Sequence, residues 1–282
     1  MVGEPRVDSG NEIKRQLGIL GVKKVRVMGD FEQVSKSVAN DEADLCLCNM
    51  QTQSNAPWNM MRGVREQEVG QNPFMVLVSM VGSTQRDELA HTIDAGPDDL
   101  MMRPFSRDVF VRRMNELAAR RKKFVVTSEY VGPTRRTEAR NEDDGGGTEE
   151  FDVPNPMRVL GFGGDREEMW RDIHAASKQL NARKLRADIR LFDALVRDIL
   201  PAYENGAIDD EFFAYLGKLL KLLAGIERRA RRIGDENLID LCALSENILT
   251  DIKERPSSPN LRNVGALPKL VTGFKFALNA IS

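Results

Sequence analysis

The sequence predicts an α/β domain built on a parallel sheet, followed by a separate domain made only of helices. Three observations support this prediction. Short apolar runs alternate with amphipathic stretches in the first half, two of these runs (DLCLC and FMVLV) have no polar face, and no strand-like segment follows Asp165. Strands that are apolar on both faces are typical of parallel sheets covered by helices on both sides.

The predicted elements of the first half follow one another closely. Apolar runs predict strands at 24–27, 43–48, 74–78 and 100–102, and helical periodicity predicts helices at 11–20, 31–38, 85–94 and 107–121. The 30 residues from Asn49 to Ser79 suit a crossover through one further helix between parallel strands.

A change of composition marks the end of this domain. Residues 138–152 include seven acidic residues, one basic residue and three consecutive glycines, a mixture that buries too little apolar surface to fold. We therefore expect a domain at 1–125, a flexible linker at 126–165 that is disordered around 143–147, and a helical domain at 166–282.

The helical domain is expected to be a four-helix bundle with breaks at 201–206, 233–235 and 255–265. Apolar residues at helical spacing are expected to form its core, namely Leu195, Ile199, Leu216, Leu219, Leu223, Leu241 and Leu244. Further aromatic residues exceed what this core needs. We expect Phe213 and Phe274 among them to lie on the surface, where they could bind a partner or a second copy of the chain in a homodimer.

Composition excludes several classes of protein. With 41 basic and 43 acidic residues, the net charge of −2 creates no general attraction to nucleic acid or to an anionic membrane. The absence of a long apolar stretch and of a signal-like start predicts a cytoplasmic protein with no membrane association. The three cysteines are expected to be reduced, and Cys46 and Cys48 are expected to be buried. With two histidines we expect no metal site and no cofactor.

Four segments occur in an order and spacing typical of a known family: VRVMGDFEQVSKSV, ADLCLCN, PFMVLVS and IDAGPDDLMMRPF. The stretch that contains them resembles the receiver domain of bacterial response regulators, a flavodoxin-like, doubly wound fold. The resemblance covers about residues 6–121. It implies that PRVDSGN is the first strand, with Asp8 as its acidic end.

The resemblance also implies that the family's phosphorylation site is degenerate here. The family's nucleophilic aspartate corresponds to Asn49, whose neutral amide is a poor nucleophile and holds Mg²⁺ weakly. Its lysine corresponds to Arg103, and its switching aromatic residue corresponds to Leu100. The hydroxyl is retained as Ser79, and Asp8 is the only carboxylate expected in the pocket.

These substitutions predict a pseudo-receiver: a non-enzymatic signalling regulator in a two-component or phosphorelay network, which binds proteins independently of phosphorylation. The resemblance places its docking face at 85–94, 100–102 and 107–117. One alternative is a phosphotransfer or phosphatase enzyme that uses His174 on the first helix of the bundle. A second, less favoured alternative is a nucleic-acid-binding regulator that uses the basic runs at 120–123, 135–136 and 228–232.

Overall fold

The computed structural model describes residues 1–50, 54–82, 85–135, 149–162, 164–256 and 260–280. The chain forms two compact units, Met1–Ser177 and Lys178–Ser282. The boundary falls within one long helix, twelve residues beyond the start predicted for the helical domain.

The first unit contains the predicted parallel sheet. Its strands are β1 (Val2–Gly3), β2 (Val27–Met28), β3 (Leu45–Asn49), β4 (Val76–Val81) and β5 (Asp99–Met102). All neighbouring strands are parallel, and their order is β2-β1-β3-β4-β5. This is the strand order of flavodoxin-like folds, so the predicted α/β class is confirmed.

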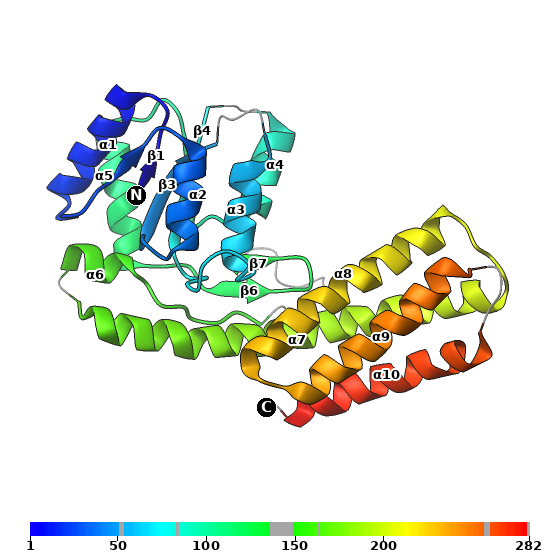
Figure 1. The fold of residues 1–282 in the computed structure, drawn as a ribbon. Coiled ribbons are helices and arrows are strands. Elements are labelled where there is room, and N and C mark those ends of the chain that lie inside the picture. The colour runs from blue at the N-terminus through cyan, green and yellow to red at the C-terminus, as the bar shows by residue number, and fades with distance from the viewer. Residues whose placement is uncertain (51–53, 83–84, 136–148, 163, 257–259, 281–282) are drawn as a thin grey trace. The chain divides into compact units, whose positions relative to one another are not determined.

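Helices cover both faces of the sheet (Figure 1). One face packs on α1 (Val7–Ile19) and α5 (Arg107–Ala119), and the other packs on α2 (Phe31–Ala39), α3 (Ala56–Arg65) and α4 (Arg86–Asp94). Local signals begin two of these helices, because Asp30 accepts a hydrogen bond from the N–H of Glu32, and Ser106 accepts one from Val109. The predicted first strand at PRVDSGN is wrong: β1 lies earlier in the chain, and Asp8 belongs to α1.

Part of the predicted flexible linker belongs to the first unit. Strands β6 (Phe124–Val126) and β7 (Val131–Pro133) form an antiparallel hairpin, Phe151 pairs with Phe124, and α6 spans Met157–Phe162. The hairpin is held by a buried charge network in which Arg65 and Arg121 both bind Asp98. Each guanidinium also lies 5.0 Å from the centre of the Phe124 ring. The predicted disorder at 143–147 lies outside the described residues.

The second unit is helical. Its residues belong to the later part of α7 (Arg166–Glu204) and to α8 (Asp210–Ile233), α9 (Glu236–Glu254) and α10 (Leu261–Ala280). Asp209 caps the start of α8, and Gly234 ends it in a left-handed conformation. α7 runs through Pro201 and ends at Glu204, within the break predicted at 201–206.

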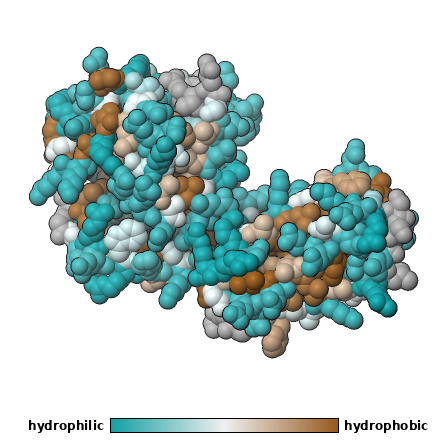
Figure 2. Space-filling view, in the orientation of Figure 1, coloured by the Kyte–Doolittle hydropathy of each residue, from teal (hydrophilic) through white to brown (hydrophobic). Residues whose placement is uncertain are grey.

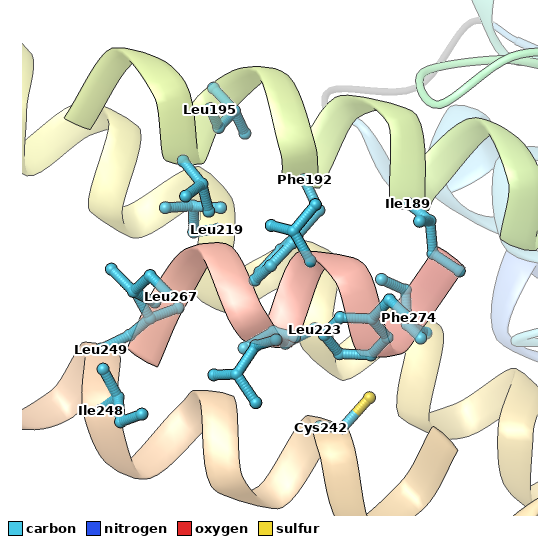
Figure 3. Close-up of a cluster of buried hydrophobic side chains, with 14 of the residues drawn as sticks. Ile189, Phe192, Leu195, Leu219, Leu223, Cys242, Ile248, Leu249, Leu267 and Phe274 are labelled. Carbon is cyan, nitrogen blue, oxygen red and sulfur yellow. The ribbon is translucent and has the colours of Figure 1, made fainter. Parts of the chain in front are cut away.

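These helices share one hydrophobic core (Figure 3). Leu195, Ile199, Leu216, Leu219 and Leu223 are buried in it, as predicted.

Two residues of this unit occupy the opposite environment from the one predicted. Phe274 is fully buried and its ring centre lies 5.2 Å from that of Phe192, so its predicted place on the surface is wrong. Leu244, predicted in the core, is 51% exposed. Phe213 is 42% exposed, in agreement with its predicted surface position.

The face shown in Figure 2 is mainly hydrophilic. In this view, apolar side chains reach it as small patches on the first unit and along the helices of the second. Among the described residues, no helix combines the length and apolar character needed to cross a membrane.

Candidate functional site

Three polar side chains meet at the carboxyl edge of the sheet. Glu4 follows β1, Asn49 ends β3 and Arg103 follows β5. Alternate residues of a strand share a face of the sheet. The residues two positions before Glu4, Asn49 and Arg103 are Val2, Leu47 and Met101, and all three lie in the core beneath α1 and α5. The three polar side chains therefore belong to that same face. The topology of the sheet therefore brings together residues that are up to 99 positions apart in the chain.

The Glu4 carboxylate is the centre of this group, which we call the edge cluster (Glu4, Asn49 and Arg103). One of its oxygens accepts hydrogen bonds from Asn49 Nδ2, at 3.2 Å, and from Arg103 Nη2. The other accepts from the backbone N–H of Arg6, at 3.0 Å, and from its Nε, at 3.5 Å. The Glu4 side chain is inaccessible to solvent, so these donors replace the water that an ionised carboxylate would otherwise bind.

This arrangement limits the chemistry of the edge cluster. A carboxylate can hold Mg²⁺ only through oxygen lone pairs that are free, and those of Glu4 are occupied by two guanidinium groups and an amide. Asn49 uses its amide as a donor and brings no anionic nucleophile. No group of three or more metal-ligating side chains occurs in the described part of the chain.

The structure places Ser79 outside the edge cluster, contrary to the sequence-based prediction. Its hydroxyl is buried on the opposite face of β4, where it donates to the sulfur of Met61 on α3, at 3.4 Å. The residue paired with Asn49 across β3 and β4 is instead Met80, whose sulfur accepts a hydrogen bond from Arg103 at 3.4 Å. A thioether therefore occupies the place predicted for a hydroxyl.

Two other predicted residues also lie away from the edge cluster. Leu100 is half-buried and packs against the core beneath α2 and α3. Asp8 is exposed in the first turn of α1, so it is not the acidic end of the first strand. Glu4 takes that place, and the sequence analysis missed it because β1 has only two residues and shows no strand pattern.

All three cysteines are buried, as predicted for Cys46 and Cys48. Burial raises the pKa of the Cys46 thiol to about 11, raises that of Cys48 well above its ordinary value, and raises that of Cys242 to about 12. All three thiols are therefore protonated and unreactive at neutral pH.

His174, the residue of the phosphotransfer alternative, is exposed on α7, with its ring centre 6.0 Å from that of Trp170.

The basic runs of the nucleic-acid alternative are partly used inside the fold. Arg121 is buried against Asp98, Arg229 is buried and contacts Asp188, and Arg135 binds Asp94 while stacking on the Tyr130 ring. These three guanidinium groups are therefore already paired with carboxylates, which makes them less available to phosphates.

The chain matches no known protein family and no curated protein. Among solved structures it is similar to a response regulator from Thermotoga maritima, with 18% identity over 41% of this chain and 92% of that one, and a TM-score of 0.36. It is also similar to a putative pilus assembly-related protein from Burkholderia pseudomallei, with 12% identity over 41% of this chain and 84% of that one, and a TM-score of 0.34. Neither similarity bears on the chemistry of the edge cluster.

Proposed function

We propose that this chain is a non-enzymatic signalling regulator that binds proteins independently of phosphorylation, within a two-component or phosphorelay network. Its sequence resembles receiver domains, and its sheet has the corresponding strand order. The observation that carries the proposal is the edge cluster, in which the buried Glu4 carboxylate is bound by Arg103 and Asn49. An internal ion pair stands where a receiver would bind a metal ion and a phosphoryl group.

The charge at the sheet edge explains why phosphorylation is not needed. A phosphorylated receiver changes state because a new anion appears at the sheet edge and attracts nearby donors. Here Arg103 is already paired with the Glu4 carboxylate, so an anion is present at the sheet edge without phosphorylation. The domain then keeps one conformation and presents one constant surface to its partners.

The face formed by α4, β5 and α5 is the partner surface that we propose. Two of its apolar side chains are partly exposed, Ile93 on α4 and Met102 on β5. Exposed apolar residues can supply binding energy when a partner covers them. In the helical unit, Phe213 is the candidate contact for an effector or for a second copy of the chain.

The experiment is to recover partners of the tagged full chain from its host cells, with and without acetyl phosphate and Mg²⁺. The proposal predicts the same partners under both conditions and their loss in the Ile93→Ser variant. A matched control is Val7→Ser, which removes an exposed apolar residue from α1 instead. A partner that binds only after phosphodonor treatment would contradict the proposal.

Phosphotransfer through His174 is the second candidate function, favoured by the exposure of its imidazole on α7. Incubation of the full chain with a phosphorylated kinase tests it. Transfer to wild type but not to His174→Gln would establish this alternative.

A further inference from the structure

Two large apolar side chains of the second unit are exposed on neighbouring helices. Leu244 on α9 is 51% exposed, and Phe276 on α10 is 79% exposed. No other large apolar side chain among the described residues is as exposed as Phe276. Because the removal of apolar surface from water is favourable, both side chains favour a partner that covers them.

Helices α9 and α10 pack side by side and run in opposite directions (Figure 1). Near the end of α9, Asp251 accepts a hydrogen bond from Asn263 at the start of α10. Further along, Leu241 packs on Gly273, where an added Cβ atom would lie 3.0 Å from the leucine side chain. These two contacts fix the register between the helices.

The register places the two exposed side chains in one patch. Leu244 lies three residues after Leu241 on α9, and Phe276 lies three residues after Gly273 on α10. Because the helices are antiparallel, the exposed side chains flank the Leu241–Gly273 contact on opposite sides, each about 4.5 Å from it along the axis. A partner can therefore cover both at once.

The two helices carry opposite charges. α9 has five acidic residues and one lysine, whereas α10 has three basic residues and no acidic residue. Asp240 is exposed one turn before Leu244, and Lys269 is exposed two turns before Phe276, so each charge shares a helix face with its apolar neighbour. Neither charged side chain forms an ion pair elsewhere in the described part of the chain.

A surface that is negative along one helix and positive along the next is complementary to a second copy of itself. If two copies meet about a twofold axis parallel to the helices, α9 of each copy faces α10 of the other, and opposite charges lie across the interface. If the axis is perpendicular to the helices, α9 faces α9 and like charges repel.

The size of this surface also suits a dimer. The 19 residues of α9 span about 28 Å, and two packed helices are about 20 Å wide, so the surface offers about 600 Å² in each copy. A dimer would then bury about 1,200 Å², which is at the lower end of the range for specific protein–protein interfaces.

We propose that the chain forms a homodimer through the α9–α10 face, which we define by Asp240, Leu244, Lys269 and Phe276, with α9 of one copy against α10 of the other. This proposal goes beyond the proposed function, because a dimer can form whether or not the chain is a signalling regulator. It leaves the exposed Phe213 on α8 to an effector.

Sedimentation velocity of the full chain between about 1 and 100 μM tests the proposal. We expect a reversible equilibrium between monomer and dimer with a micromolar Kd, and a Kd at least about tenfold higher for Phe276→Ser. The matched control Val7→Ser removes a side chain that is 70% exposed on α1, and it should dimerise like wild type.

Three results would overturn the proposal. The chain could remain monomeric up to about 100 μM, which would leave the α9–α10 face to a different protein. Its Kd could be the same in wild type and Phe276→Ser. Finally, Phe213→Ser could abolish a dimer that Phe276→Ser retains, which would place the interface on α8.

Charge reversal tests the arrangement of the two copies. Lys269→Glu and Asp240→Lys should each weaken dimerisation, because each places like charges across the interface. The double variant restores opposite charges and should recover dimerisation. Both positions are exposed, so the variants should melt at nearly the wild-type temperature. Weakening in each single variant without recovery in the double variant would overturn the packing of α9 against α10.

Discussion

Truncation of two phenylalanines in the helical unit should have very different consequences. Phe274 is fully buried against Phe192 in the shared core (Figure 3), whereas Phe213 is 42% exposed at the start of α8. Removing a buried phenylalanine side chain costs the transfer free energy of its atoms and leaves a cavity, together about 3–5 kcal/mol. We expect Phe274→Ala to cost this much and Phe213→Ala to cost less than about 1 kcal/mol.

Hydrogen exchange followed by mass spectrometry of the full chain measures this difference. A loss of 3–5 kcal/mol corresponds to exchange about 100-fold faster or more in the most protected amides of α8, α9 and α10. In Phe213→Ala the same amides should exchange at nearly the wild-type rate. Equal protection in the two variants would refute the assignment of Phe274 to the core.

Four further predictions concern buried groups in the first unit. Burial raises the pKa of Asp98, but the charges of Arg121 and Arg65 more than offset this and hold it below its ordinary value of 3.8. The ionised Asp98 therefore stabilises the fold above about pH 4, and this stability should be lost as the pH falls through the pKa of Asp98 in the folded state. Acid unfolding of wild type and of Asp98→Asn tests this, because the loss of stability with falling pH should be smaller in the variant. At neutral pH, Asp98→Asn should cost about 3–5 kcal/mol in denaturant unfolding, because it leaves two arginines without their buried anion; a cost below about 1 kcal/mol would show that the network is dispensable. The thiols of Cys46 and Cys48 should resist iodoacetamide in the native protein and react once it is unfolded, and rapid native labelling would contradict their burial. Asn49→Asp should place a second carboxylate beside Glu4 and increase Mn²⁺ binding measured by calorimetry, with Ser79→Ala as a control that leaves Mn²⁺ binding unchanged.

The sequence was sufficient to predict the elements with strong patterns. The apolar runs around β3 and β4 lack a polar face because helices cover both sides, and that pattern predicts a parallel sheet without further information. The resemblance to receiver domains, and not the apolar pattern, singled out Asn49 and Arg103, which lie at the end of β3 and just after β5. Helical periodicity likewise placed most of the core leucines of the second unit.

The errors have identifiable physical causes. A strand of two residues has no periodicity, so β1 was missed, and Glu4 with it. Ser79 lies next to the correct position, but neighbouring residues on a strand face opposite sides of the sheet, so a shift of one residue moved it out of the site. Periodicity also could not show that Phe274 faces Phe192, because that contact joins helices that are far apart in sequence.

The hairpin after α5 was taken for a linker because its stability depends on tertiary contacts. Its turn residues and polar composition are typical of a loop. The buried Asp98 network and the Phe124 ring hold it in place, and these contacts come from residues of α3, β4 and β5 and their connections.

The mass of the intact chain after incubation with acetyl phosphate and Mg²⁺ shows whether the edge cluster can be phosphorylated. The edge cluster predicts that wild type gains no hydroxylamine-sensitive phosphoryl group, because Asn49 offers no anionic oxygen and Glu4 is already bound by Arg103. An authentic receiver domain treated in parallel serves as the positive control. Detection of an acyl phosphate on Glu4, Asp8 or any other carboxylate at the sheet edge would contradict the account.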